Sequence, residues 1–567
     1  MDFGIWLLVG AALVFFMHCG FAMLETGFTR AKNAANIIMK NVMNFCLGTV
    51  CFTLIGFSIM CAEEYLFGLI GVPNLGIFTD FNNFDFSGFV FNLVFCATAA
   101  TIVSGAMAER TKFSAYCLYC MVITSVIYPI EAGWVWNENG WLAQRGYIDF
   151  AGSSAIHMVG GIAAFIAAAM LGPRIGKYAV DPATGRKVAR AIPGHSLTLG
   201  ALGCLILWFG WYGFNGAAAG NVSQLGVIFL NTTISPAVAA VVTMLFTWTK
   251  NGRPDVSMSL NGLLAGLAAI TAGCSNVDAL GAILIGAMAG FLLVVAVEFI
   301  DFKLCVDDPV GAVAVHGVGG MWGALAVGLF ARPMAAGENI ISEAAGLFYG
   351  GGLHQLGVQA TGVVSITIWT AVTMGITFFI INKLHGLRAS AEDEIMGLDS
   401  SEHGLASSYA DFLPVADPSL HILTDGSKEK FAPVPAAPGA TIPTIGVSAG
   451  KKLTKVTIIT RQRKFEALKA AFDQIGVTGI TVTTVMGYGV QRGHTHKYRG
   501  VPLESPLQPK IQIDVVISKI PVEALIDLVK KVLHTGRIGD GKIFVYDVEN
   551  VVKVRTGEEG YDALQDI

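Results

Sequence analysis

Two stretches decide the fold of this chain: residues 149–161 read DFAGSSAIHMVGG, and residues 308–320 read DPVGAVAVHGVGG. Both follow the pattern D-x2-G-x4-H-x-V-G-G inside apolar runs, and their histidines, His157 and His316, stand 159 positions apart. An ionisable group inside a membrane span is costly and usually functional. Its recurrence at matching places in two halves predicts a site at a repeat interface.

The composition predicts a membrane protein with a soluble C-terminal domain. Of the 567 residues, 53% are hydrophobic and 14% are charged, which indicates several membrane spans. Charged residues are sparse up to about residue 385 and dense from about residue 450. We therefore predict a membrane domain over 1–384 and a soluble domain over 451–567. The net charge of −4 says little about partners, and we expect no nucleic-acid partner.

About eleven apolar runs are long enough to cross a bilayer. They are residues 4–24, 40–61, 88–108, 112–131, 151–172, 195–214, 224–248, 256–273, 278–300, 310–331 and 358–383. Most lysines and arginines fall in one alternate set of loops, whereas the other set holds only Arg145 and Arg332. The positive-inside rule then predicts an outside N-terminus and a cytoplasmic C-terminal domain, in a multi-pass protein of the cell (inner) membrane.

The two histidines fall in the fifth and tenth predicted spans, so the two halves have opposite orientations. This is the inverted repeat of many transporters. Each aspartate precedes its histidine by eight residues, or about 12 Å along a helix, so we expect the histidines near the midplane. Asp149 and Asp308 are also good helix N-caps, and for both a capping role stays open beside a functional one. The glycines that follow permit close helix approach.

Two neutral imidazoles in a narrow apolar pore could pass a small polar molecule or relay protons. A metal site is the weaker hypothesis, because no third ligand has suggestive spacing. Cys117 and Cys120 lack a second pair, and the ten cysteines favour packing roles. His18, which has no counterpart in the repeat, also favours packing.

Residues 1–410 resemble the Amt/Mep/Rh ammonium transporter family. Besides the histidine motifs, the matching stretches are 20–27 (GFAMLETG), 105–110 (GAMAER), 210–215 (GWYGFN), 307–309 (DDP), 386–388 (GLR) and 397–404 (GLDSSEHG). The resemblance implies that His157 and His316 line a pore and that residues 385–410 form a cytoplasmic tail. It also implies electrogenic ammonium uptake, in which ammonia and proton cross separately and recombine.

The resemblance assigns further roles on the outer side of the pore. Trp136 and Phe95 match an outer recruitment site, where cation–π attraction explains the residue type. Phe95 and Phe214 match a stacked phenyl gate, and Phe91 lies one turn from Phe95. Asp149 matches a carboxylate needed near this site.

One residue departs from the family pattern. Ala218 stands where some members place a serine, so an acceptor is missing and we expect weaker outer binding.

The C-terminal region has its own pattern. Residues 411–450 are rich in Pro, Ala, Gly and Ser and predict a flexible linker. Strands at 453–460, 479–487, 510–517 and 542–548, with helices at 464–475 and 521–534, predict an α+β ferredoxin-like domain with a long central loop.

Residues 452–567 resemble a PII nitrogen-signalling protein on the stretches 487–495 (GYGVQRGHT), 535–542 (TGRIGDGK) and 553–558 (KVRTGE). The resemblance implies binding of ATP or ADP, and of 2-oxoglutarate through an ATP-held Mg²⁺, with a T-loop at 488–509. The nucleotide residues are Gly487, Gly489, Gly539, Asp540, Gly541, Lys542, Lys553 and Arg555. The 2-oxoglutarate residues are Arg461, Gln491 and Lys510, and Gln491 holds the metal.

Two T-loop positions depart from the PII pattern, and one matches it closely. Leu503 replaces the modified tyrosine, which excludes uridylylation there, and Val490 replaces a basic residue. Arg499 matches the arginine that soluble relatives insert into the transporter's pore mouth.

Both families imply a homotrimer, so three linked PII domains could share one axis. The leading hypothesis is an ammonium transporter plugged by its own T-loop and released by ATP and 2-oxoglutarate. A sensor that reports transporter state to a partner is the main alternative, and a gas channel is a weaker one. We expect no enzymatic activity and no redox cofactor.

Overall fold

The computed structural model describes residues 3–180, 185, 187–336, 339–405, 452–461, 464–477, 479–487, 496–498, 501–503, 508–536 and 540–564. The chain divides into two compact units, Met1–Phe412 and Leu413–Ile567, which we call the membrane unit and the C-terminal unit. The division falls in the segment for which the sequence predicts a linker, 411–450, which lies outside the described residues.

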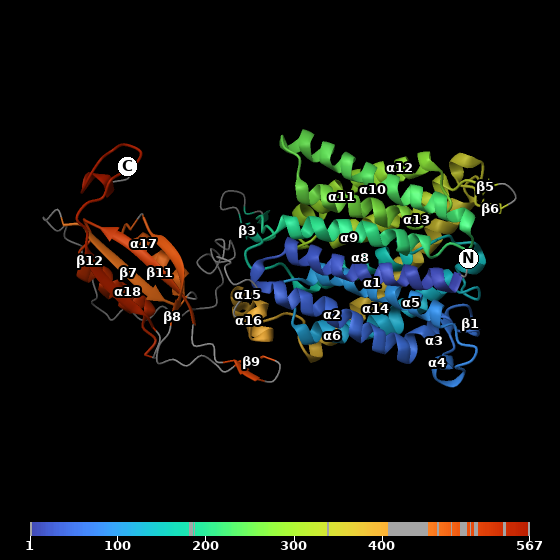
Figure 1. The fold of residues 1–567 in the computed structure, drawn as a ribbon, viewed down its shortest axis with the longest axis horizontal. Helices are drawn as coiled ribbons and strands as arrows, with labels where there is room; N and C mark the ends of the chain where they lie inside the picture. The colour runs from blue at the N-terminus through green and yellow to red at the C-terminus, as the bar shows by residue number, and fades with distance from the viewer. Residues whose placement is uncertain are drawn as a thin grey trace. The chain divides into compact units, whose positions relative to one another are not determined.

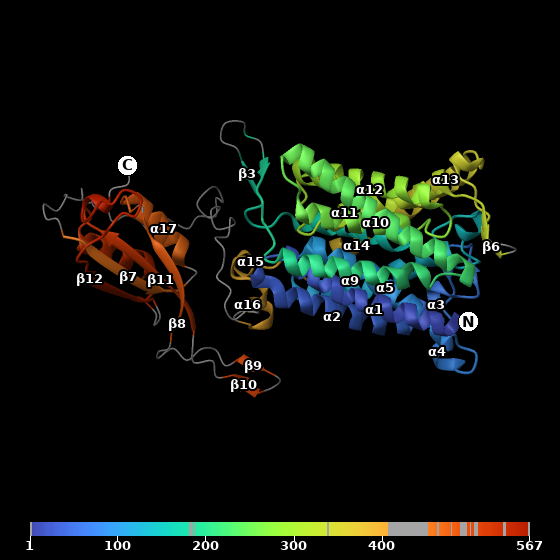
Figure 2. The ribbon, with the colours of Figure 1, turned by 45° about the horizontal axis from the view of Figure 1, so that its top comes forward.

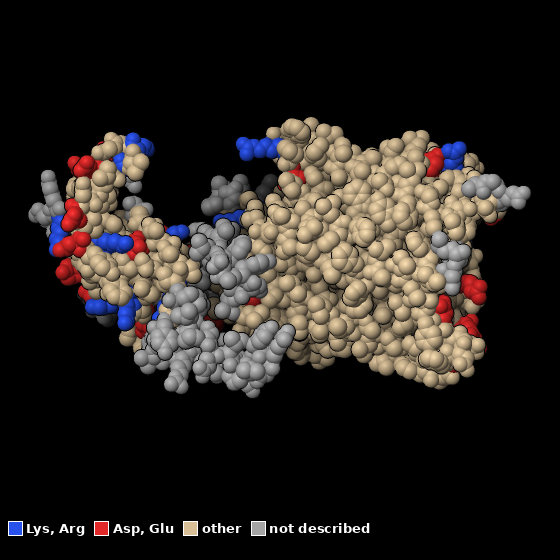
Figure 3. Space-filling model, in the orientation of Figure 1, with Lys and Arg blue, Asp and Glu red and all other residues tan. Residues whose placement is uncertain are grey.

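The membrane unit is a bundle of apolar helices. Among the described residues, ten helical stretches are long and apolar enough to cross a membrane: Gly4–Phe28, Ala31–Met60, Phe86–Met107, Phe113–Trp136, Ser153–Leu171, Leu197–Gly216, Val222–Asn251, Ala279–Leu304, Val313–Phe330 and His354–Leu384. The side of the bundle seen in Figure 3 carries almost no charge, and charged side chains gather at its ends. A bilayer requires this distribution, because charge in hydrocarbon is costly.

In chain order the main helices of this unit are α1 (Phe3–Phe28), α2 (Ala34–Cys51), α3 (Phe57–Met60), α4 (Gly76–Thr79), α5 (Phe86–Met107), α6 (Phe113–Val122), α7 (Tyr128–Trp136), α8 (Val159–Leu171), α9 (Leu197–Gly216), α10 (Val222–Asn251), α11 (Val256–Ile270), α12 (Ala279–Glu298), α13 (Gly319–Phe330) and α14 (His354–Leu384) (Figure 1). π-Helical turns interrupt or extend several of them: η2 (Phe52–Gly56), η3 (Ile123–Ile127), η5 (Ser153–Met158), η6 (Phe299–Leu304) and η7 (Val313–Val318). Short hairpins join some ends: β1–β2 (Tyr65–Leu66, Ile70–Gly71), β3–β4 (Tyr178–Val180, Lys187–Ala189) and β5–β6 (Met334–Ala336, Asn339–Ser342).

The predicted span at 256–273 is present as a shorter helix. α11 has 15 residues, which is about 22 Å at about 1.5 Å per residue and less than the roughly 30 Å of a hydrocarbon core. Beyond Ile270, the carbonyls of Thr271 and Ala272 accept hydrogen bonds from the backbone N–H groups of Ala151 and Phe150. The chain therefore leaves the helix to pair with the first histidine motif.

Residues 386–405 fold against one end of the bundle, which we call the tail side; the opposite end is the far side. α15 (Ala391–Met396) and α16 (Leu398–His403) lie beside the start of α2 (Figure 2). The Asp399 carboxylate accepts hydrogen bonds from the N–H groups of Ala35 and Asn36 at 3.1 and 2.8 Å. The tail thus satisfies donors at the first turn of α2, which have no partner inside the helix.

The C-terminal unit is a four-stranded antiparallel sheet with two helices. Its strands are β7 (Thr454–Thr460), β8 (Thr481–Gly487), β11 (Gln508–Ile517) and β12 (Lys542–Asp547), in the order β12-β7-β11-β8. α17 (Phe465–Gln474) and α18 (Val522–Leu533) cover the sheet (Figure 1). Leu525, Val529 and Leu533, four residues apart on α18, are buried in its core. The predicted ferredoxin-like fold is confirmed.

The long connection between β8 and β11 contains a hairpin that the sequence pattern does not predict. Its strands are β9 (His496–Tyr498) and β10 (Val501–Leu503), which pair antiparallel with Val501 opposite Tyr498. The flanking residues 488–495, 499–500 and 504–507 lie outside the described residues.

Candidate functional site

The two histidine motifs adopt the same local backbone. In each motif the glycine before the helical turn has a positive φ, Gly152 at 108° and Gly311 at 83°, a region in which glycine has no steric penalty. The histidine then lies within a π-helical turn, η5 in the first copy and η7 in the second. π-Helical turns are rare and occur frequently at functional sites. The sequence repeat is therefore also a structural repeat.

The motifs cross each other backbone to backbone. A Cβ atom added at Gly161 would lie 2.1 Å from the backbone nitrogen of Gly317, and one added at Gly320 would lie 2.3 Å from the carbonyl oxygen of Ser153. Side chains cannot fit at these distances, so the glycines of one motif permit contact with the other. The motif glycines thus supply the close approach that their sequence pattern predicts.

The crossing brings His157 and His316 into direct contact. Their Nδ1 atoms are 3.2 Å apart, and the rings are stacked with centroids at 5.1 Å. A hydrogen bond between two neutral imidazoles needs one Nδ1–H donor and one bare Nδ1 acceptor, so the two rings take opposite tautomers. His157 is fully buried, and its Nε2 has no hydrogen-bond partner among the described residues. The pair can thus accept or pass on a proton without carrying a fixed charge.

A column of aromatic rings joins the histidine pair to the far side. Phe214 stacks on His157 with centroids at 5.5 Å, and Phe95 meets Phe214 at 4.4 Å. The two phenyl rings meet edge to face, at an interplanar angle of 70°, rather than as a parallel stack. Phe91 contacts Phe95 in the same way at 4.4 Å, and Trp136 follows at 6.2 Å. The structure thus brings these predicted site residues together along one path.

Trp136 is tied to the first motif. Its indole Nε1–H donates to the carbonyl oxygen of Asp149 at 2.7 Å. Ala218 is half-buried just after α9 and packs against the same apolar core. A methyl group at this position adds no polar atom.

Both motif aspartates cap their helical turns. The Asp149 carboxylate accepts from the backbone N–H groups of residues 152–155 and from the Ser154 hydroxyl, at 2.6 to 3.0 Å. The Asp308 carboxylate accepts from the backbone N–H groups of residues 310, 311 and 313. Burial raises the pKa of Asp308, and the backbone N–H donors partly offset that rise. Capping therefore accounts for both carboxylates, and a transport role for Asp149 stays a prediction.

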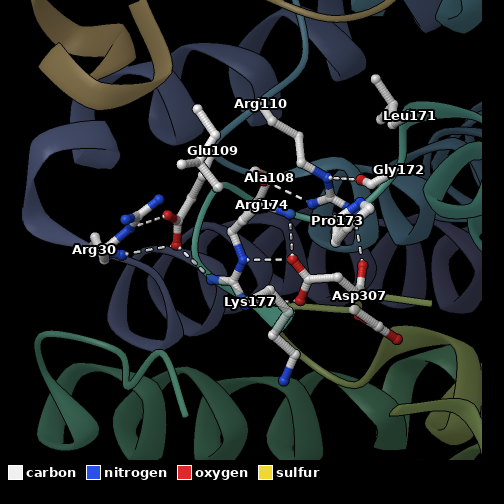
Figure 4. Close-up of polar contacts among 12 residues, drawn as sticks. Arg30, Ala108, Glu109, Arg110, Leu171, Gly172, Pro173, Arg174, Lys177 and Asp307 are labelled. Atoms are coloured by element: carbon white, nitrogen blue, oxygen red, sulfur yellow. Dashed lines mark hydrogen bonds and ion pairs between the residues drawn. The ribbon is translucent and has the colours of Figure 1, made fainter. Parts of the chain in front are cut away.

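A buried ion network closes the tail side and joins the two halves of the repeat (Figure 4). Arg174 donates to Glu109 at 2.9 Å and forms a bidentate pair with Asp307, while Arg30 also pairs with Glu109. Burial raises the pKa of Glu109, but the two guanidinium groups outweigh it and lower that pKa to about 2. Arg174 also holds the pKa of Asp307 well below its ordinary value against the effect of burial. The sequence shows Glu109 and Asp307 only as parts of matching stretches, and Arg30 and Arg174 only as charges in the loops between spans, without a role.

The tail is bound to the same region. Arg388 donates to the carbonyl oxygens of Leu171 and Pro173, at 2.8 Å each, and to the Glu394 carboxylate. Glu394 in turn accepts from the backbone N–H of Ile175 at 2.7 Å. The tail therefore contacts the loop that follows the first motif.

In the C-terminal unit, several predicted ligand residues gather at one end of the sheet. Asp540 follows the loop after α18, and its carbonyl accepts from the Thr460 hydroxyl at 3.1 Å. Hydrogen bonds from Thr535 hold the pKa of the exposed Asp540 carboxylate below its ordinary value. Gly541 has φ 123° and passes so close to β7 that an added Cβ would lie 2.3 Å from the Ile459 carbonyl oxygen. Lys542 then starts β12.

Other predicted ligand residues share this end. A Cβ atom added at Gly487 would lie 2.9 Å from Cδ of Lys510, which places the two residues side by side. Lys510 stands next to Ile511, which pairs with Thr460, and Arg461 follows that strand directly. These basic side chains and glycine backbones suit a polyphosphate or a dicarboxylic acid.

The remaining basic pair is anchored elsewhere. Lys553 and Arg555 belong to a hairpin closed by the Val552–Glu559 bridge. The hairpin leaves the sheet next to Val548, whose N–H donates to Leu453 at the other end of β7. One copy of the domain therefore anchors its predicted nucleotide residues at both ends of the same strand pair. Gly489, Gln491, Arg499 and Gly539 lie outside the described residues.

The described residues include no group of three or more His, Cys, Asp or Glu side chains that could hold a metal ion. All ten cysteines are described and are free thiols.

The sequence profile of the Ammonium Transporter Family matches residues 5–408, and that of the Nitrogen regulatory protein P-II matches residues 453–558. Ammonium transporter Amt2 of Archaeoglobus fulgidus is 42% identical over 431 residues, covering 73% of this chain and 89% of the relative. Ammonium transporter 1 member 3 of Solanum lycopersicum is 37% identical, over 70% of this chain and 91% of the relative.

Solved structures agree with these relatives. The structure of a Sensor Amt Protein superposes with a TM-score of 0.64 at 36% identity, covering 70% of this chain and 98% of its own. The crystal structure of Candida albicans Mep2 superposes with a TM-score of 0.60 at 26% identity, covering 69% of this chain and 87% of its own. The chain therefore belongs to the Ammonium Transporter Family and carries a C-terminal domain of the nitrogen regulatory protein P-II family.

Proposed function

We propose that this protein carries ammonium across the cell membrane by separating it into ammonia and a proton. The observation that supports the proposal most directly is the contact between His157 and His316 beneath a continuous column of aromatic rings. A bare cation in so apolar a passage is expensive. Ammonia has no such cost, and the proton can pass along two imidazoles that exchange tautomers. Net charge then crosses the membrane with each ammonium, so transport is electrogenic.

This mechanism also explains selectivity. A potassium ion has no proton to give up, so it would have to cross the apolar column with its full charge. Ammonium is first held on the far side by Trp136 and Phe95 through cation–π attraction. Phe91 and Phe214 narrow the path below, and the Asp149 carboxylate adds negative charge nearby. Ala218 provides no hydroxyl, which weakens this outer binding.

We further propose that the C-terminal domain gates transport. Gly487, Lys510, Asp540, Gly541 and Lys542, with Arg461, suit binding of ATP or ADP and 2-oxoglutarate. Gln491 would hold the Mg²⁺ of ATP, and Gly489 and Gly539 would contribute backbone N–H groups. Lys553 and Arg555 are anchored at the opposite end of the domain. A homotrimer would bring these two groups of residues together, because the hairpin of one subunit would then complete the site of its neighbour.

The T-loop at 488–509 is the proposed plug. Arg499 would enter the cytoplasmic pore exit when 2-oxoglutarate is scarce, and ligand binding would withdraw it. The tail, residues 385–410, and the linker, residues 411–450, connect the domain to the membrane unit. Tethering replaces a bimolecular encounter with an effective concentration of about millimolar. The orientation follows the positive-inside rule, with the N-terminus outside and the P-II domain in the cytoplasm.

A second candidate function is ammonium sensing, in which the domain reports the state of the transporter to a partner. One observation favours it: the solved structure that superposes at 36% identity is that of a Sensor Amt Protein. In this case ammonium occupies the same pore, but nucleotide and 2-oxoglutarate do not alter transport.

The test is ammonium-evoked current from the full-length protein in proteoliposomes on a solid-supported membrane. We expect current in the wild type and a loss of about 100-fold in His157→Ala, the lower range for removal of an acid–base group. Addition of ATP, Mg²⁺ and 2-oxoglutarate should raise the wild-type current. The current of Arg499→Ala should be high even without these ligands. Currents that ignore these ligands would favour the sensor. A wild-type protein without current would overturn the transport proposal.

A further inference from the structure

A small cavity lies directly beneath the histidine pair on the tail side. It has a volume of about 20 Å³ and is lined by His316, Phe21, Glu25 and Asn261, among others. One water molecule needs a volume of at least about 10–15 Å³, and ammonia is of similar size. A molecule that leaves the histidine pair toward the tail side would therefore enter a space with a carboxylate in its wall.

Glu25 is a buried carboxylate inside the span formed by α1. It is 2% exposed, and its Oε2 accepts from Asn41 at 3.1 Å and from the Ser104 hydroxyl at 2.9 Å. No lysine or arginine among the described residues forms an ion pair with it. An ionisable group inside a membrane span is costly and usually functional.

The other polar groups around the cavity are acceptors or distant charges. Asn261 donates to the Val310 carbonyl through Nδ2, and its Oδ1 has no partner among the described residues. Lys40 is fully buried and lies within electrostatic reach of Glu25, but its Nζ is placed over the Tyr116 ring at 5.4 Å. The cavity thus has acceptors without an adjacent cation, which suits an ammonium ion with its four N–H donors.

Three other carboxylates on the tail side are already engaged. Asp307 and Glu109 are held by arginines, and Asp308 caps its helical turn. Glu25 is the one carboxylate among the residues that line this cavity.

We propose that Glu25 is the acid that reforms ammonium at the exit of the histidine pair. This inference rests on the proposed transport mechanism and adds a residue to it. Neutral Glu25 gives its carboxyl proton to ammonia in the cavity, so an O–H bond breaks, an N–H bond forms, and ammonium and the Glu25 carboxylate result. The proton removed from ammonium on the far side reaches the carboxylate through His157 and His316 and restores the neutral acid. Each cycle thus moves one ammonia and one proton.

The test is Glu25→Gln in the full-length protein, with ammonium-evoked current recorded over a pH series that is equal on both sides of the membrane. Glutamine keeps acceptors for Asn41 and Ser104 but cannot carry the proton. We expect a current at least about 100-fold lower, the lower end of the range for lost acid–base groups. We also expect the pH profile to lose the titration of Glu25, the carboxylate that faces His316, Lys40 and Tyr116.

Two controls separate this role from a structural one. Glu298→Gln removes a half-exposed carboxylate that pairs with Lys250 at the surface, and its current should equal that of the wild type. Ser104→Ala removes one hydrogen bond to Glu25 but keeps the carboxyl group, so the titration of Glu25 should persist in this variant. Wild-type current and pH profile in Glu25→Gln would overturn the proposal. Absence of current in the wild type would instead count against transport itself.

Discussion

The two copies of the histidine motif follow the same backbone path but have different neighbours. On the far side, the Asp149 turn adjoins Trp136 and a column of phenyl rings. On the tail side, Asp308 adjoins an ion network, and the cavity beneath His316 includes the polar side chains of Glu25 and Asn261 in its wall. The shared backbone positions two equal imidazoles, whereas the neighbours make the two ends of the path chemically unequal. A symmetric repeat can thus support directional chemistry because its surroundings are asymmetric.

The largest expected effect comes from breaking the crossing that makes the copies meet. Gly161→Val would place a branched side chain where even a Cβ lies 2.1 Å from the Gly317 nitrogen. Backbone cannot yield as a flexible side chain can, so we expect loss of the folded protein. Gel filtration in detergent measures this. Gly226→Ala, where an added Cβ meets nothing within 4 Å, is the control and should behave as wild type. A monodisperse, transporting Gly161→Val protein would contradict the crossing.

The second-largest expected effect is a loss of stability when the buried ion network of the tail side is broken. Arg174→Gln removes a cation from two buried carboxylates, and breaking a buried pair costs about 3–5 kcal/mol. In the wild type the pKa of Glu109 is lowered from 4.5 to about 2, so its contribution is present above pH 4.5 and is lost as pH falls toward 2. In the variant that pKa moves back toward its ordinary value, so the contribution of Glu109 and its loss between pH 4.5 and about 2 both become smaller.

Thermal unfolding across this pH window measures the difference. The control is Arg332→Gln, which affects a half-exposed pair with Asp278 at the far side. Equal pH dependence in wild type and Arg174→Gln would show that the network does not stabilise the fold.

The smallest effect compares the two caps directly. Asp149→Ala removes an acceptor of five hydrogen bonds, and Asp308→Ala removes an acceptor of three. Loss of a cap costs about 0.5–2 kcal/mol. We expect the loss of stability in Asp149→Ala to lie at or above the upper end of this range, and that in Asp308→Ala to lie near its lower end. Thermal unfolding measures both.

A further variant, Asp149→Asn, tests the role of Asp149 in transport. If Asp149 only caps its turn, Asp149→Asn, which keeps one acceptor oxygen, should retain current in proportion to its stability. A loss of current without a loss of stability would show a second role.

Much of the fold follows from local patterns in the chain. Apolar runs and the charge of alternate loops predict the spans, because the bilayer penalises every polar group in them. The main exception is α11, which ends at Ile270 because the carbonyls beyond it bind Phe150 and Ala151. No local pattern reports a partner that lies so far away in the sequence.

The candidate site, like the fold, could be predicted from the sequence only in part. The sequence by itself determined that His157 and His316 are a related pair in antiparallel halves, because a duplicated motif and an odd span count are properties of the chain alone. Only the tertiary structure decided that their Nδ1 atoms meet at 3.2 Å, and that Glu25 of α1 lines the cavity below them. The physical reason is that contact geometry depends on backbone crossings such as Gly161 on Gly317, which join residues far apart in the sequence.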